Sequence, residues 1–211
     1  TRGYYLSNDP NSRILLLVDG HSMVEFFGYY NGHLASVDLN FVERIEIVRG
    51  PNSTLYGTNA MFTVINIITK TGENIDGFNI IGEGGSFKRY KGAFAYGKKF
   101  DDIEVFAQAT YLQDGVQELY FNEYDSPDYP SNGKTTGTCN REEIINSSFN
   151  FSYKDFTIHG LYNNRKKNVP TGIYGGMFND DRTFFQDINQ FLELKYHTKI
   201  ADKVDANFRI Y

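Results

Sequence analysis

The sequence predicts a β-rich membrane protein made of a small α/β unit followed by antiparallel hairpins that form the wall of a transmembrane β-barrel. Three observations lead there: short, well-patterned strands before residue 70, a period of two that begins at residue 77 and persists, and loops that alternate in length. Most strands of the second part have about ten residues or more, which is roughly what a tilted strand needs to cross a bilayer.

The first unit opens with an apolar run at residues 14–18 that stops at Asp19-Gly20. A short run that is apolar on both faces is typical of a fully buried strand. Residues 43–48 alternate charged side chains with Ile and Val, which predicts a half-buried strand. This strand must end near Gly50, because Pro51 cannot donate to a ladder.

A third strand is predicted over residues 64–69. Asn66 lies within it and is expected to be a buried amide, which requires hydrogen-bond partners. Gly57 follows Tyr56 in the turn that precedes this strand, and we expect a positive φ there, so that glycine is needed for its backbone freedom.

From residue 77 onward, seven strands are predicted, each with one apolar face, at 77–83, 87–97, 102–113, 142–153, 155–167, 187–198 and 203–211. Alternate side chains of a strand point to opposite faces. In the third of these strands the predicted apolar face, expected to contact lipid, consists of Ile103, Val105, Ala107, Ala109 and Tyr111. The opposite face, expected to line the lumen, carries Glu104, Gln108 and Thr110.

Loop lengths distinguish a membrane barrel from a soluble β-sandwich. The connections after the second, fourth and sixth strands are short, as is the one near Gly84-Gly85-Ser86, whereas 114–141 and 168–186 are long. Outer-membrane barrels have short periplasmic turns and long outer loops. Three tyrosines precede short turns, where an aromatic girdle would lie: Tyr96, Tyr153 and Tyr196.

Composition excludes several function classes. The chain has 211 residues and a net charge of −5, which argues against nucleic acid as a partner. No catalytic, phosphate-binding or metal-ligand motif is present, so we expect neither an enzyme nor a cofactor. The only cysteine, Cys139, excludes an internal disulfide. Loop carboxylates such as Asp125 and Asp128 lack calcium-loop spacing, and a solvated loop is the favoured interpretation.

Residues 13–20 and 43–70 resemble the plug domain of TonB-dependent outer-membrane receptors. The residues in register with the family's usual wording are Asp19-Gly20, Glu43-Arg44-Ile45-Glu46, Arg49-Gly50-Pro51, Ser53, Leu55-Tyr56-Gly57, Ala60 and the strand from Val64 to Lys70. Phe62-Thr63 stand where the family usually has a glycine pair. The resemblance implies a plug portion at 1–73 and, at 74–211, the first strands of a barrel that has 22 strands in this family. The chain is therefore expected to be an internal piece of a longer receptor.

The resemblance also implies a function. Such receptors take up scarce nutrients across the outer membrane of Gram-negative bacteria, with energy from the TonB–ExbB–ExbD complex, and they are surrounded by outer-membrane lipid and lipopolysaccharide. A ferric siderophore or similar metal chelate is the favoured ligand. The alternatives are cobalamin, haem or a saccharide, a structural or adhesive barrel without transport, and a soluble α/β fragment that only resembles the family.

We expect the ligand at the plug apices, in an unusually aromatic segment after Gly20 and around residues 58–59, with the long loops closing over it. The predicted ligand-binding residues are His21, Phe26, Tyr29, Tyr30, Thr58 and Asn59. An equally weighted alternative is that the aromatic rings pack against the barrel wall. The residues assigned to the structural plug motif are Asp19, Gly20, Arg49, Gly50, Pro51, Tyr56, Gly57 and Asn66.

Overall fold

The computed structural model describes residues 13–23, 37–128, 131–200 and 204–211. The chain divides into two compact units, Thr1–Lys70 and Thr71–Tyr211, and each is considered by itself. The division falls three residues before the predicted boundary between 73 and 74. That assignment of plug and barrel segments stays a prediction.

Within its described residues the first unit holds one four-stranded sheet in the order β2-β1-β4-β3. Its elements are β1 (Ile14–Val18), β2 (His21–Ser22), the 3-10 turn η2 (Leu39–Phe41), β3 (Val42–Arg49), α1 (Ser53–Tyr56) and β4 (Thr63–Thr69). Strands β1 and β4 run parallel, whereas β2 and β3 pair antiparallel with them. All three strands predicted from the sequence are present, with bounds that differ by no more than one residue at either end.

The core of this unit forms around the central strands. Four of the five residues of β1 are buried, as the apolar run predicts for a strand covered on both faces. Leu15, Leu17 and Val64 form a buried cluster with Ala60, which has no exposed surface. Ala60 comes from the turn before β4, so this turn closes one face of the sheet.

Strand β3 corrects one prediction. Its alternating pattern predicts a half-buried strand, yet every residue after Val42 is exposed. The side chains of Ile45 and Ile47 remain 49% and 55% exposed. The physical reason is the position of β3 at the edge of the sheet, where β4 covers its flank but no described residue covers this apolar face.

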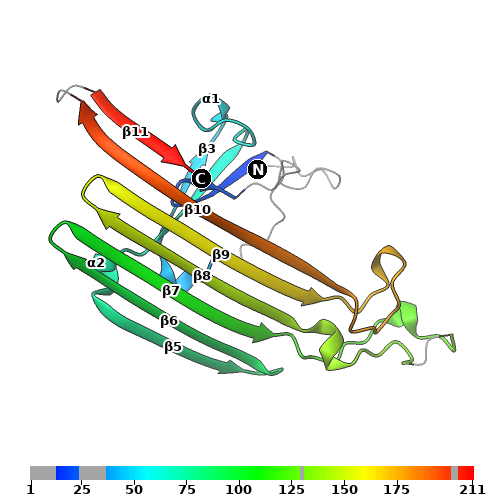
Figure 1. The fold of residues 1–211 in the computed structure, drawn as a ribbon. Coiled ribbons are helices and arrows are strands. Elements are labelled where there is room, and N and C mark those ends of the chain that lie inside the picture. The colour runs from blue at the N-terminus through cyan, green and yellow to red at the C-terminus, as the bar shows by residue number, and fades with distance from the viewer. Residues whose placement is uncertain (1–12, 24–36, 129–130, 201–203) are drawn as a thin grey trace. The chain divides into compact units, whose positions relative to one another are not determined.

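The described part of the second unit contains a seven-stranded antiparallel sheet in simple chain order (Figure 1). Its strands are β5 (Gly77–Gly85), β6 (Arg89–Phe100), β7 (Ile103–Asp114), β8 (Glu142–Tyr153), β9 (Phe156–Asn168), β10 (Phe184–Ile200) and β11 (Val204–Ile210). The seven predicted strands are thus confirmed, with β10 longer at both ends than predicted. No helix among the described residues is long and apolar enough to cross a membrane.

The two faces of this sheet separate as the period of two predicts. On β7, Gln108 and Thr110 are each 6% exposed, whereas Ala107, Ala109 and Tyr111 lie on the opposite, exposed face. The register continues this division across the sheet, because Ala107 lies opposite Phe149 and Gln108 opposite Ser148. We call the face of Gln108 the inner face and the face of Ala107 the outer face.

The short turns between β6 and β7 and between β8 and β9 lie at one end of the sheet, and the long loops lie at the other (Figure 1). The long loops, 115–141 and 169–183, leave the same end as the turn between β5 and β6. That turn is later than predicted: β5 continues through Gly85, and the positive φ angles fall at Phe87 and Lys88. The prediction of the turn rests on Gly84 and Gly85, whereas the hydrogen bond from Arg89 N–H to Ser86 C=O shows that the turn runs from Ser86 to Arg89.

Aromatic side chains gather on the outer face near the short turns. The Tyr96 ring lies 4.8 Å from that of Phe78, and the Tyr196 ring stacks 4.5 Å from that of Phe156. Tyr153 lies in the same cross-strand row, directly opposite Phe156. Tyr153 and Tyr196 therefore share one cross-strand row with Phe156, whereas Tyr96 lies opposite Ala107 in a separate row.

The single-turn helix that precedes β5 is not predicted by the sequence patterns. Helix α2 (Gly72–Ile75) is a single turn, capped by reciprocal hydrogen bonds between Thr71 and Asn74. It packs against β6 at a point where Gly97 allows close approach, since a side chain there would collide with Ile75. Four residues are too few to show a helical period.

Candidate functional site

The turn after β1 is held by side chains from β4. Asp19 adopts φ 49°, a left-handed conformation, and Gly20 follows with φ 76°. The Asp19 carboxylate accepts hydrogen bonds from the backbone N–H of Thr69 at 2.9 Å and from its hydroxyl at 2.7 Å. The Gly20 N–H donates to Asn66 Oδ1 at 3.1 Å. These motif residues therefore fix the turn to the sheet.

Asn66 has the partners that a polar strand residue needs, but it is half-buried rather than buried as predicted. Its Oδ1 accepts from Gly20, and its Nδ2 donates to Glu46 at 3.4 Å. The difference arises because β3, the neighbour that supplies Glu46, is itself exposed. Asn66 thus bridges the turn after β1 to the edge strand.

The segment that joins β3 to β4 is a closed loop. Gly50 N–H donates to Phe62 C=O and Asn52 N–H to Ala60 C=O, both at 2.9 Å, so the hairpin continues past Arg49 and Pro51. Between them the chain makes the single helical turn α1, of which Tyr56 is the last residue. This turn and the residues around it are mostly exposed.

Gly57 ends α1 with φ 80° and ψ −147°, which confirms the predicted positive φ. This combination lies close to a region that only glycine populates readily. A Cβ built on Gly57 meets no atom within 4 Å. The requirement for glycine is therefore one of backbone conformation and not of space.

The predicted ligand-binding residues lie in different places. His21 is 9% exposed and lies opposite Val18, at the carboxyl end of β1. Exposed Thr58 and half-buried Asn59 precede β4, whose first residue pairs with Ile14 at the other end of β1. Four residue steps along β1 separate these ends by about 13 Å. Three further residues lie outside the described residues: Phe26, Tyr29 and Tyr30.

The inner face of the second unit carries buried polar side chains, among them Gln108, which the strand period assigns to this face, and Glu193, which it does not single out. Gln108 Nε2 donates to Asn146 Oδ1 at 2.6 Å and to Ser148 Oγ at 3.1 Å. Nearer the short turns, Glu193 is fully buried; its Oε1 accepts from Arg209 Nε at 2.7 Å and its Oε2 pairs with Lys195 Nζ at 3.0 Å. A polar inner wall of this kind suits a barrel whose lumen holds water or a plug.

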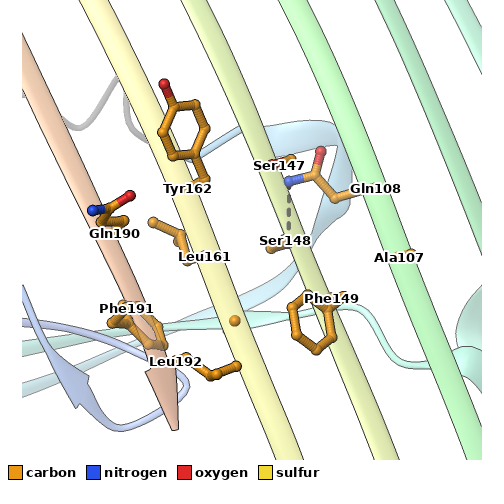
Figure 2. Close-up of a pocket in the computed structure, with 11 residues that line it drawn as sticks. Ala107, Gln108, Ser147, Ser148, Phe149, Leu161, Tyr162, Gln190, Phe191 and Leu192 are labelled. Atoms are coloured by element: carbon orange, nitrogen blue, oxygen red, sulfur yellow. Dashed lines mark hydrogen bonds between the residues drawn. The ribbon is translucent and has the colours of Figure 1, made fainter. Parts of the chain in front are cut away.

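The outer face is hollowed where β8 meets β9 (Figure 2). A cavity of about 670 Å³ is lined mainly by outer-face residues, among them Ala107, Ser147 and Tyr162. The Phe149 ring leans over Gly160, so that a Cβ on Gly160 would lie well inside contact distance of the ring. Glycine at this position lets the Phe149 ring pack directly against the neighbouring strand.

Two of the carboxylates at the start of and within loop 115–141 have protein partners. Asp114 pairs with Arg89 at 2.5 Å, and Asp125 accepts from the Tyr120 hydroxyl at 2.5 Å. Within the described ranges, no group of three His, Cys, Asp or Glu side chains is placed to hold a metal ion.

Comparison with known proteins identifies the first unit. Residues 2–64 match the model of the TonB-dependent receptor plug domain. A stretch of 67 residues is 33% identical to the vitamin B12 transporter BtuB of Vibrio vulnificus, covering 32% of this chain and 11% of that protein.

Solved structures of outer-membrane receptors match most of this chain in fold. The pyoverdine outer membrane receptor FpvA of Pseudomonas aeruginosa matches 95% of this chain with a TM-score of 0.59 at 14% identity, over 29% of its own length. The siderophore receptor PiuA of Acinetobacter baumannii matches 94% with a TM-score of 0.56 at 12% identity, over 28% of its length. At these identities the likeness shows the fold.

The architecture is that of a plug domain followed by the wall of a transmembrane β-barrel. The first unit thus contains a TonB-dependent receptor plug domain, and the chain shares the fold of solved outer-membrane receptors. The chain spans about a tenth of the length of the curated relative and under a third of the solved receptors.

Proposed function

We propose that this chain belongs to a transporter that takes up a scarce nutrient across the outer membrane of a Gram-negative bacterium, driven by the TonB–ExbB–ExbD complex. The observation that carries the proposal is the plug domain immediately followed by a barrel wall. A plug has a use only in a barrel that must open for cargo, so a purely structural or adhesive barrel is the weaker alternative.

A ferric siderophore or similar metal chelate is the proposed ligand class. Its support is that FpvA and PiuA, which share the fold, are receptors for such ligands by name. Cobalamin is the second candidate, because the relative matched in sequence is a vitamin B12 transporter. Haem and saccharides stay as further alternatives.

The proposed ligand surface comprises residues 21–36 and the exposed turn at Thr58 and Asn59. Among the described members of this set, His21 and Met23 are buried, at 9% and 7% exposed. The long loops 115–141 and 169–183 leave one end of the sheet, and we place that end outside the cell. The outer face of the sheet then contacts membrane lipid and lipopolysaccharide.

The test replaces Phe26, Tyr29 and Tyr30 together with alanine in the full-length receptor. Uptake at limiting ligand should fall, because each buried aromatic ring lost from a binding surface costs on the order of 1–3 kcal/mol. Radiolabelled ferric chelate and cobalamin, supplied separately, distinguish the two ligand classes. Phe100→Ala at the short-turn end is the matched aromatic control and should leave uptake unchanged. Full uptake by the triple variant would assign these rings to packing.

A further inference from the structure

The two long loops meet in an aromatic cluster. Phe178, from loop 169–183, stacks on Tyr124 of loop 115–141 with ring centroids 4.1 Å apart and planes 7° from parallel. It also meets the Phe121 ring edge-on at 5.9 Å. Phe178 is only 9% exposed, although it lies in a loop at the end of the sheet. The loops therefore share one small apolar core.

Hydrogen bonds cross the same joint in both directions. The Thr136 N–H donates to Asn179 Oδ1 at 2.7 Å, and the Gly172 N–H donates to the Tyr124 hydroxyl at 3.2 Å. In each case, a side chain of one loop accepts a hydrogen bond from a backbone N–H of the other loop. A cavity of about 360 Å³ lies beside the stacked rings of Tyr124 and Phe178 and is lined by residues of both loops. The contact between the loops is therefore not close-packed throughout.

Cys139 follows Thr136, the residue that bonds to Asn179, by three positions in the sequence. It is 1% exposed, and its Sγ lies 3.0 Å from the Thr136 hydroxyl. The next residue, Asn140, accepts from Lys167 Nζ on β9 at 2.8 Å. The thiol is thus buried in the base of loop 115–141, next to the residue that bonds to the other loop.

We infer that loops 115–141 and 169–183 form a single cap that opens and closes as one cooperative unit, with Phe178 as its shared core residue. Segments that share buried contacts unfold together, whereas segments without them open separately. Opening of the cap exposes the thiol of Cys139. The inference concerns these loops alone and does not depend on which ligand the receptor takes up.

The test measures how fast a maleimide modifies Cys139 in the full-length receptor, with modification at this residue followed by peptide mass spectrometry. Phe178→Ala removes the ring from loop 169–183 and leaves loop 115–141 unchanged in sequence. We expect it to raise the labelling rate of Cys139 at least tenfold. Hydrogen exchange in loops 115–141 and 169–183 should rise together.

Two further variants make the test specific. Asn179 has φ 59°, so Asn179→Gly removes the acceptor of Thr136 N–H without straining the backbone. This variant should also speed the labelling of Cys139. If Phe178→Ala fails to assemble, Asn179→Gly provides the test. Tyr174 is 94% exposed, so Tyr174→Ala should leave Cys139 as slow as in the wild type. Loosening of loop 169–183 alone, with unchanged labelling of Cys139, would overturn the inference, as would equal acceleration by Tyr174→Ala.

Discussion

Asp19 and Thr69 are joined by two hydrogen bonds across fifty residues of sequence, one to the backbone N–H and one to the hydroxyl. Through them the turn after the most buried strand of the plug is tied to the end of β4. Asp19 itself adopts a left-handed backbone conformation. It therefore forms the turn and, through its carboxylate, also acts as a clamp that holds the turn to β4.

Replacing Asp19 tests the clamp. Asp19→Asn keeps a residue that tolerates positive φ and retains one acceptor, whereas Asp19→Ala loses both acceptors and strains the turn. We expect Asp19→Ala to destabilise the plug by about 1–3 kcal/mol, and Asp19→Asn by less. Protease resistance of the plug in the assembled receptor measures the effect. In a Thr69→Val background the cost of Asp19→Asn should shrink, and an unchanged cost would show that the two residues act independently.

Gly57 offers a test of backbone conformation separate from packing. Gly57→Ala adds a side chain where nothing lies within 4 Å, so any loss of stability must come from φ 80°. We expect a cost of about 1–3 kcal/mol, and at least as much for Gly57→Val. Thr58→Ala, next in sequence and exposed, is the control. Wild-type resistance to protease in Gly57→Val would contradict the argument.

The outer face of β7 allows a depth-dependent test of lipid contact. Ala107 is the middle of its five outer-face residues and Ile103 is at the short-turn rim, with Val105 between them. An arginine should cost about 2–4 kcal/mol at Ala107, and only about 0–1 kcal/mol at Ile103. Unfolding in lipid vesicles measures both. Equal costs at the two positions would argue against a membrane-spanning wall.

Gly160 tests the contact between β8 and β9. Gly160→Ala must push the Phe149 ring off the strand, and overpacking of this kind typically costs about 1–3 kcal/mol. In a Phe149→Leu background the same substitution should cost less, because the smaller side chain can give way. A double-mutant cycle, measured by thermal unfolding, gives the coupling energy between positions 149 and 160. Strict additivity of the two substitutions would refute a direct contact effect.

Asp180 provides a pH test in loop 169–183. Hydrogen bonds from the Arg182 guanidinium and backbone lower the pKa of the Asp180 carboxyl from 3.8 to about 2. Because the folded pKa is depressed, the pair stabilises the loop fully above pH 3.8 and loses this effect as pH falls towards 2. Arg182→Ala should return the pKa of Asp180 towards its ordinary value. An NMR titration of this carboxyl shows whether it does.

Features that depend on neighbouring residues in the sequence could be predicted, whereas features that depend on contacts between distant residues could not. The faces of β7 were predictable because alternation is a local property of each strand. The exposure of Ile45 and Ile47 was not, because burial depends on what covers the face, and no pattern within β3 records that. The clamp between Asp19 and Thr69 joins residues fifty apart, and the motif identifies both without saying that they touch.

The loops show the same limit at the candidate site. Their positions and approximate lengths follow from where the strand period stops. The stacking of Phe178 on Tyr124 could not be predicted, since loop residues have no period that assigns them a face. Similarly, the turn at Phe87 and Lys88 lacks the Asn-Gly or Gly-Gly signal that such turns usually carry, so the glycines before it misplaced the prediction.

The ladders from β5 to β11 run without a recorded register shift across the described residues, and this limits how the chain can change length during evolution. A one-residue deletion inside β8 would turn Asn146 and Ser148 towards the outer face and bring Ile145 and Phe149 inside. Insertions and deletions that selection tolerates in these strands should therefore come in pairs of residues. Single-residue changes should accumulate in the turns and in the two long loops, so the spacing of homologous strands would preserve parity even where sequence identity has been lost.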